Sequence, residues 1–101
     1  MSKILRFQIQ TIMEDKKLEA LKRELLQWIL DGKKKKATHM IDVCDTFDYD
    51  NYPVYVKKGE SLEEKEKEVR AGSMQRINRV LDLSSQETED LIKQLTDELA
   101  A

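Results

Sequence analysis

Residues 15–31 carry the pattern that most constrains how this chain can fold. Large apolar side chains recur there at helical spacing, at Leu18, Leu21, Leu25, Trp28 and Ile29. Steps of three and four place them on one face, which predicts an amphipathic helix. Leu26 and Leu30 widen this apolar face beyond what one neighbouring element would cover. The stripe around Trp28 is therefore the candidate subunit interface.

The length of the chain also favours self-association. A chain of 101 residues buries only about 60–65% of the surface that its unfolded form exposes. With 38% of its residues charged, it has little apolar material for a core of its own. We expect residues 1–101 to form one oligomerising domain. The net charge of -2 argues against general nucleic-acid binding.

The cysteine content and the hydropathy indicate where the protein works. The single cysteine, Cys44, excludes an internal disulfide and fits a reducing compartment. The sequence has no run of about 18 apolar residues, so no membrane span is predicted. The first residues have no uninterrupted apolar stretch typical of a signal peptide. We expect a cytoplasmic protein that makes no membrane contact.

The remaining segments predict an α+β fold. Residues 37–44 and 53–58 look like two strands of an antiparallel hairpin with a long loop between them. Helices are expected at 61–71, 74–83 and 85–99, and Gly32 is the expected left-handed C-cap of the first helix. Residues 4–10 alternate apolar and polar side chains, which favours a third strand, although a helical start stays open. The prediction is a small antiparallel sheet packed with three to four helices.

The loop after residue 44 is the densest candidate for ligand binding. Phe47, Tyr49 and Tyr52 lie within six residues, and Tyr55 follows on the second strand. Aromatic faces beside polar groups suit a flat ligand such as a nucleobase, where stacking is worth about 1–3 kcal/mol per base. The alternative is that these rings cover one end of a small core.

Nothing in the sequence predicts catalysis. The aspartates between residues 42 and 50, with His39, miss the spacing of a calcium loop, so solvated turn acids are the better interpretation. His39 has no signalled nucleophile beside it, and Cys44 lacks electropositive neighbours. We therefore expect no enzyme activity, no catalytic residue, no metal and no cofactor. A metal-dependent hydrolase that uses the aspartates is the weakest alternative.

Two basic clusters could hold an anion. The first is the lysine run 33–36, for which solvation of the helix end is the simpler interpretation. The second is Arg76 with Arg79, one turn apart on the helix expected at 74–83, next to amides that would favour phosphate. Its alternative is a surface helix with ordinary solvated arginines.

The segment from Thr38 to Val56 resembles a widespread family of small phage-encoded proteins. The likeness rests on Cys-Asp-Thr-Phe-Asp-Tyr at 44–49 and Tyr-Pro-Val-Tyr-Val at 52–56, and Ser73-Met74-Gln75-Arg76 extends it. The family is identified here with the anti-CBASS sponges, which sequester cyclic oligonucleotide immune signals. Asp42 departs from the family pattern, where an apolar residue is usual.

The resemblance implies a phage-encoded protein that acts in the host cytoplasm and helps the phage to evade host immunity. It would bind a cyclic oligonucleotide, such as a cyclic dinucleotide, without cleaving it. The residues implied in ligand binding are Thr46, Phe47, Tyr49, Tyr52, Tyr55, Lys57 and Arg76. Because a cyclic dinucleotide is nearly two-fold symmetric, a pocket across a two-fold interface would match it, and the resemblance implies a tetramer.

A second function class depends on the residues alone. The wide apolar stripe of residues 18–30, together with an acidic C-terminal segment, also suits a protein–protein interaction module. Such a module would inhibit or modulate a host protein through its helical surface. These two hypotheses differ in which part of the molecule makes the functional contact.

Overall fold

The order of elements along the chain is helix, two strands, helix, strand, helix. The computed structural model describes the backbone of residues 2–100 and the side chains of residues 15–100. Its elements are α1 (Ser2–Lys34), β1 (His39–Asp45), β2 (Asp50–Val56), α2 (Leu62–Ala71), β3 (Gln75–Asp82) and α3 (Gln86–Ala100). The strands form one antiparallel sheet in the order β2-β1-β3. The α+β class and the 37–44/53–58 hairpin are confirmed.

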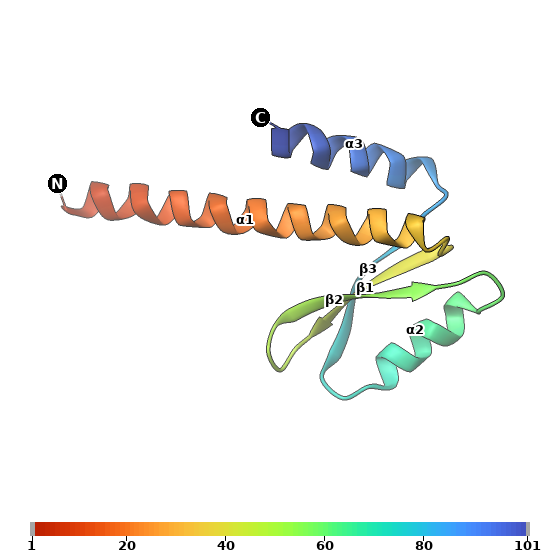
Figure 1. The fold of residues 1–101 in the computed structure, drawn as a ribbon. Coiled ribbons are helices and arrows are strands. Elements are labelled where there is room, and N and C mark those ends of the chain that lie inside the picture. Colours follow the sequence, from red (N-terminus) through yellow and green to blue (C-terminus); the bar gives the residue numbers. More distant parts are fainter. Residues whose placement is uncertain (1, 101) are drawn as a thin grey trace.

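The helices lie on both faces of the sheet (Figure 1). α1 and α3 lie side by side on one face and α2 lies on the other. Because successive side chains of a strand point to opposite faces, the central strand β1 supplies both layers. Met40 packs with Ile29 of α1 and Leu95 of α3. Ile41 and Val43 pack with Val69 of α2.

A β-bulge interrupts the pairing of β1 with β3. Asp42 pairs with Arg79 and the next residue, Val43, pairs with Ile77, so Asn78 is an extra residue on β3. A bulge places two residues of one strand opposite one residue of the other and breaks the regular alternation. Ile77 and Val80, three residues apart, consequently pack in the same cluster on the α2 face.

This bulge explains why the helix predicted at 74–83 is wrong. Apolar residues at 77, 80 and 81 match helical spacing, but Ile77 and Val80 share one face of β3 and Leu81 packs on the other. Arg76 and Arg79 are thus strand residues paired with Cys44 and Asp42. The predicted helix N-terminus with two arginines one turn apart does not exist.

The backbone of residues 4–10 is helical, so the strand prediction for this segment is wrong. No glycine or proline occurs before Gly32, and the segment has no breaker that would separate it from the helix that follows. α1 therefore runs for 33 residues, roughly 50 Å at 1.5 Å per residue. Its N-terminal end extends beyond the end of α3 (Figure 1).

Gly32 is inside α1, so its predicted role as a left-handed C-cap is also wrong. The positive φ falls on Lys36, at 60°. A Cβ on Gly32 would lie 2.8 Å from Leu83 Cδ1 and 2.8 Å from Tyr55 Cε1. The glycine is needed because α1 approaches the sheet closely at this point.

Both remaining helices begin at a serine cap. The Ser61 hydroxyl accepts a hydrogen bond from the Glu64 amide at 3.3 Å. The Ser85 hydroxyl accepts one from the Thr88 amide at 3.3 Å before α3. The hairpin loop is shorter than expected, because β1 and β2 extend to Asp45 and Asp50. Within residues 2–100, no helix is both long and apolar enough to span a membrane.

Candidate functional site

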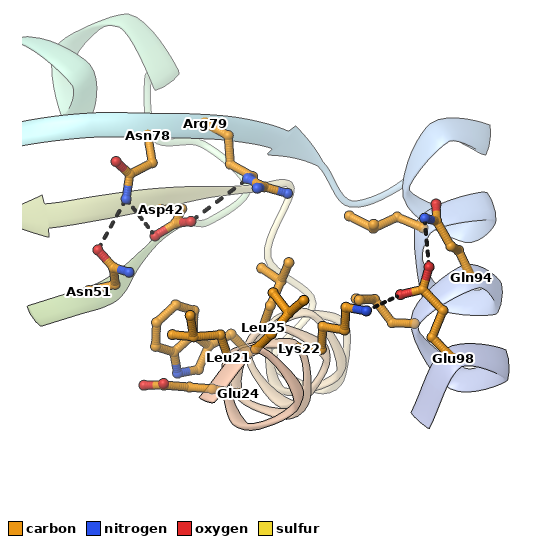
Figure 2. Close-up of a pocket in the computed structure, with 14 residues that line it drawn as sticks. Leu21, Lys22, Glu24, Leu25, Asp42, Asn51, Asn78, Arg79, Gln94 and Glu98 are labelled. Atoms are coloured by element: carbon orange, nitrogen blue, oxygen red, sulfur yellow. Dashed lines mark hydrogen bonds and ion pairs between the residues drawn. The ribbon is translucent and has the colours of Figure 1, made fainter. Parts of the chain in front are cut away.

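A groove of about 570 Å³ lies between α1, α3 and the sheet. α1 crosses the sheet near one end, so the rest of that sheet face stands away from the helices (Figures 1 and 2). We call this space the α1 groove. The groove exists because α1 and α3 contact only part of this sheet face.

The wall formed by α1 is mostly apolar, with Lys22 and Glu24 as its charged members. Leu18, Leu21, Leu25 and Trp28 line it, and Leu91 and Leu95 of α3 continue it. Leu18 is 50% exposed and Leu21 is 46% exposed. Further along the helix, Ile29 is completely buried against Met40. The stripe that the sequence revealed therefore divides in two: its C-terminal part builds the core, and Leu18 and Leu21 are left at the groove.

The opposite wall, formed by the sheet, is polar. Asp42, Asn51, Asn78 and Arg79 line it, one or two from each strand. Asp42 Oδ2 lies 3.8 Å from Arg79 Nε, and Asn78 Nδ2 donates to Asp42 Oδ1 at 3.5 Å and to Asn51 Oδ1 at 3.1 Å (Figure 2). The bulge places Asn78 beside Arg79 on this wall.

Asp42 is the only carboxylate among the buried residues in the described part of the chain. It is 7% exposed. Burial raises its pKa above the usual range, and the hydrogen bond from Asn78 and the charge of Arg79 oppose this effect only in part. The charged form is therefore held in surroundings that favour the neutral one.

The edge of the groove towards α3 is closed by an ion pair. Lys22 Nζ of α1 lies 2.9 Å from Glu98 Oε2 of α3, and Gln94 Nε2 donates to Glu98 Oε1 at 3.1 Å (Figure 2). The bonds from Lys22 and Gln94 lower the pKa of Glu98. These contacts join α3 to α1 along this edge of the groove.

A smaller hollow of about 250 Å³ continues along α1 towards its N-terminal end. It shares Leu18, Lys22 and Glu98 with the α1 groove and adds Asp15, Glu19 and Leu99. From Trp28 to Asp15 the two hollows follow α1 over roughly 20 Å, at 1.5 Å per residue. The track is elongated, a shape that fits a segment of a partner chain better than a compact ligand.

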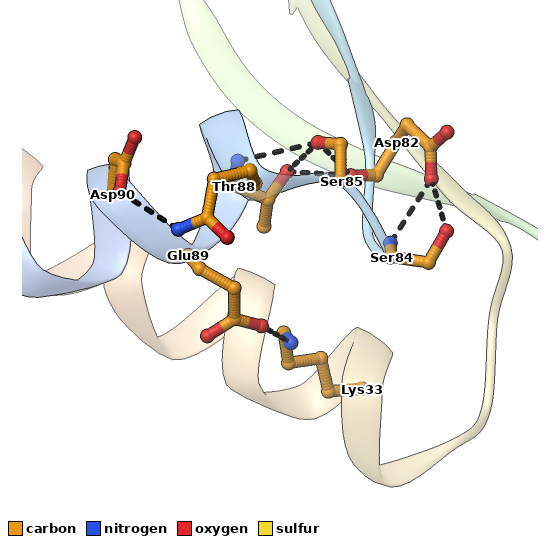
Figure 3. A network of polar contacts seen from close by, with 8 residues as sticks. Lys33, Asp82, Ser84, Ser85, Thr88, Glu89 and Asp90 are labelled. Atoms are coloured by element: carbon orange, nitrogen blue, oxygen red, sulfur yellow. Dashed lines mark hydrogen bonds and ion pairs between the residues drawn. The ribbon is translucent and has the colours of Figure 1, made fainter.

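The start of α3 is anchored by a polar network that fixes its direction (Figure 3). The fully buried Thr88 donates from Oγ1 to the Asp82 carbonyl at 2.6 Å, and Ser85 Oγ donates to the same carbonyl at 2.7 Å. Bonds from the Ser84 hydroxyl and amide lower the pKa of Asp82. Lys33 of α1 pairs with Glu89 of α3.

Five of the seven residues predicted to bind a ligand lie at one end of the sheet. The Thr46 amide donates to the Met74 carbonyl at 2.8 Å, which joins the β1–β2 turn to the start of β3. We call this region, residues 46–49 with 74–76, the hairpin end. It includes Thr46, Phe47, Tyr49 and Arg76, and Tyr52 reaches it through a 2.6 Å hydrogen bond from Gln75.

The rings at the hairpin end are among the most exposed apolar groups that the structure describes. Phe47 is 70% exposed and Tyr49 is 77% exposed. Tyr49 and Met74 each hold a φ of 59°, a left-handed conformation that non-glycine residues rarely adopt. Strained backbone of this kind is enriched at functional sites.

The other two predicted residues lie elsewhere. Tyr55 is on the α1 face, where its hydroxyl donates to the Trp28 carbonyl at 2.8 Å and its ring lies under Lys35, 4.8 Å away. Lys57 follows the last residue of β2, a strand length of roughly 20 Å from the turn. One subunit therefore does not bring all seven residues together.

Of the four residues of the polar wall, sequence reasoning missed Asn51 and Asn78, grouped the buried Asp42 with solvated turn acids and placed Arg79 on a helix. Asn51 and Asn78 had no distinguishing pattern, because their neighbours across the sheet depend on register and on the bulge. The one signal was Asp42, an acidic residue in an otherwise apolar strand. Among the described residues, no three histidine, cysteine, aspartate or glutamate side chains gather where they could hold a metal ion.

The comparisons with known proteins add no relative. No family model matches the chain, and no curated protein or solved structure does. The function must be argued from the two surfaces described above, the α1 groove and the hairpin end.

Proposed function

We propose that this protein is a non-catalytic protein-binding module, and that the α1 groove holds a segment of its partner. The observation that carries the proposal is the apolar wall. Leu18 and Leu21 stay half exposed although the fold has buried Ile29 of the same helix face completely. Burying such a side chain fully is worth about 1.5–3 kcal/mol, so a partner that covers both gains affinity from them.

Substitutions on α1 test this proposal with a matched control. Leu30 is 43% exposed, close to the 46% of Leu21, but it does not line the groove. Immobilised wild-type protein and the variants Leu21→Ser and Leu30→Ser would be exposed to lysate of the producing cell, and the retained proteins would be compared by mass spectrometry. We expect Leu30→Ser to retain what the wild type retains and Leu21→Ser to lose it. Equal retention by all three would contradict a function of the groove.

A cyclic-oligonucleotide sponge is the second candidate, and the hairpin end favours it. Phe47 and Tyr49 present rings to solvent at the same end of the sheet as Arg76. Such rings can stack bases, and an arginine can pair with phosphate. Because Tyr55 and Lys57 lie away from this end, a complete site needs a second subunit. This function therefore entails the homo-oligomer, up to a tetramer, in the cytoplasm of a phage host.

Calorimetry with a panel of cyclic dinucleotides and trinucleotides tests the sponge. The expected result is submicromolar binding that Tyr49→Ala abolishes, with the nucleotide recovered intact after the protein is heated. Leu21→Ser is the control, since it lies outside the hairpin end. Native mass spectrometry of the same samples reports the number of subunits. No binding across the panel would exclude this candidate and leave the groove proposal standing.

A further inference from the structure

Asp42 has a feature that the fold does not explain. It is a buried carboxylate in the middle of β1, between the fully buried Ile41 and Val43. Burying a charge is costly unless it is well paired. An apolar residue at this position would make the folded state more stable, so the presence of Asp42 has a reason other than stability.

The contacts of Asp42 within the chain are long. Charge-assisted N–H···O bonds are usually about 2.7–2.9 Å, whereas Arg79 Nε lies 3.8 Å away and Asn78 Nδ2 lies 3.5 Å away. Asn78 also donates to Asn51, at the shorter distance of 3.1 Å. Asp42 is among the residues that line the α1 groove (Figure 2), so a donor bound in the groove could approach the carboxylate more closely than these two contacts do.

The charge along the groove and its continuation has one prevailing sign. Five acidic side chains line the two hollows, against the two basic side chains Lys22 and Arg79. Glu98 pairs with Lys22, Glu19 with Arg23 and Asp42, at 3.8 Å, with Arg79. The other two, Asp15 and Glu24, give the track its excess of negative charge. A basic partner is therefore electrostatically complementary to the track, and an acidic one is not.

The opposite wall sets the second requirement for the partner. Leu18, Leu21 and Leu25 recur at helical spacing, so they offer apolar contacts along the groove rather than at one point. A helix presents apolar side chains at the same spacing. A lysine or arginine on that helix could lay its apolar stem along the leucines and extend its charged head to the sheet.

We propose that the partner of the α1 groove is an amphipathic helix that inserts one lysine or arginine against Asp42. The inference rests on the proposed function and specifies its ligand: apolar residues contact the leucines of α1, and one basic residue completes the coordination of the buried carboxylate. A second copy of the chain, whose net charge is -2, is the alternative occupant, and sedimentation tests it.

A display library tests the proposal without knowledge of the natural partner. The library would hold helical 14-residue peptides with leucine at i, i+3, i+4 and i+7 and with three positions fully randomised. We expect peptides selected on the wild-type protein to be enriched in lysine or arginine at one randomised position. Replacing that residue with glutamine should weaken binding about tenfold or more.

Variants of the protein locate this preference. Asp42→Asn keeps the shape of the side chain and should abolish the difference between lysine and glutamine peptides. Asp48→Asn removes an exposed turn carboxylate outside the groove and should leave the difference unchanged. Arg79→Gln removes the cation that already lies near Asp42 and should enlarge the difference between lysine and glutamine peptides. This variant provides the test if Asp42→Asn does not fold.

The outcomes separate this inference from the proposed function. Peptides that bind the groove equally well with lysine or glutamine would overturn the role of Asp42 and leave the groove as a binding site. No bound peptide at all would overturn both. Sedimentation gives the last outcome: self-association that Leu21→Ser abolishes and Leu30→Ser does not would show that a second copy occupies the groove, and would overturn the proposal.

Discussion

The two faces of the sheet are covered in opposite ways. On the α2 face, Ile41, Val43 and Val56 are at most 1% exposed under a single helix of ten residues. On the α1 face, two longer helices bury Met40 completely and yet leave a groove lined by leucines beside a buried aspartate. Helix α2 therefore closes the sheet face that it covers, whereas α1 and α3 leave part of the other face open. Close packing on one face provides the rigid support from which the other can present a binding surface.

The largest effect should come from truncating the closed face. Ile41→Ala removes a side chain with no exposed surface, and we expect a loss of about 2–5 kcal/mol in the free energy of unfolding. Leu21→Ala, at 46% exposure, should cost less than about 1 kcal/mol. Urea denaturation of both variants measures the contrast. Equal losses would show that the groove leucine supports the fold as much as the core does.

The next effect concerns the network that anchors α3. Thr88→Val keeps the shape of the buried side chain but removes its hydrogen bond to the Asp82 carbonyl. We expect the free energy of unfolding to fall by about 1–3 kcal/mol. Thr88→Ser retains the hydroxyl and serves as control. A valine variant as stable as the wild type would mean that the 2.6 Å contact does not hold α3 in place.

A smaller loss is expected where α1 approaches the sheet. Gly32→Ala would bring a Cβ within 2.8 Å of Leu83 Cδ1 and Tyr55 Cε1. Overpacking costs about 1–3 kcal/mol, partly offset by a gain of up to about 1 kcal/mol in helix propensity. We expect a net loss of about 1 kcal/mol in thermal or urea unfolding. Ala20→Gly, on the exposed surface of α1, measures the difference in helix propensity between alanine and glycine. A Gly32→Ala variant that gains as much stability as Ala20→Gly loses would refute the close approach.

The smallest effect should be a gain in stability. The pKa of Asp42 is higher in the folded state than in the unfolded state. Protonation of Asp42 therefore stabilises the fold fully below the unfolded pKa of about 3.9, and this stabilisation is lost as the pH rises through the folded pKa. Asp42→Asn should therefore be more stable than the wild type at pH 7, and this advantage should shrink below pH 4. Urea midpoints at pH 7 and pH 3.5 measure it. A variant less stable at neutral pH would show that Asp42 serves the fold and not a partner.

What the sequence could predict depended on how local the signal was. Helices α2 and α3 and the hairpin strands follow from caps and short patterns, and they lie within a few residues of the expected positions. β3 did not, because its apolar spacing depends on pairing with β1 and on the bulge at Asn78. Residues 4–10 alternate like a strand but continue a helix that no residue before Gly32 interrupts.

The candidate sites show the same limit. The aromatic residues of the hairpin end were visible as a cluster because they are close in sequence. The polar wall of the α1 groove combines residues from three strands, so it exists only once the sheet register is known. Asp42 was noticeable as an acidic residue in an apolar strand, but its place in a groove could not be predicted from that strand alone.

The bulge at Asn78 also bears on how this protein can evolve. A point substitution on β3 changes one contact at a time. Loss of the single codon for Asn78 would restore regular alternation without a shift, because Arg79 and Ile77 already pair with the consecutive residues Asp42 and Val43. Ile77 would stay on the α2 face and Arg79 at the groove, and the amide that contacts Asp42 and Asn51 would be lost. An insertion or deletion within a regular part of β3 would instead move every side chain beyond it to the other face, because the side-chain period is two. A deletion at the bulge is therefore a length change that this sheet can accept, and it would alter the groove while leaving the α2 face as it is.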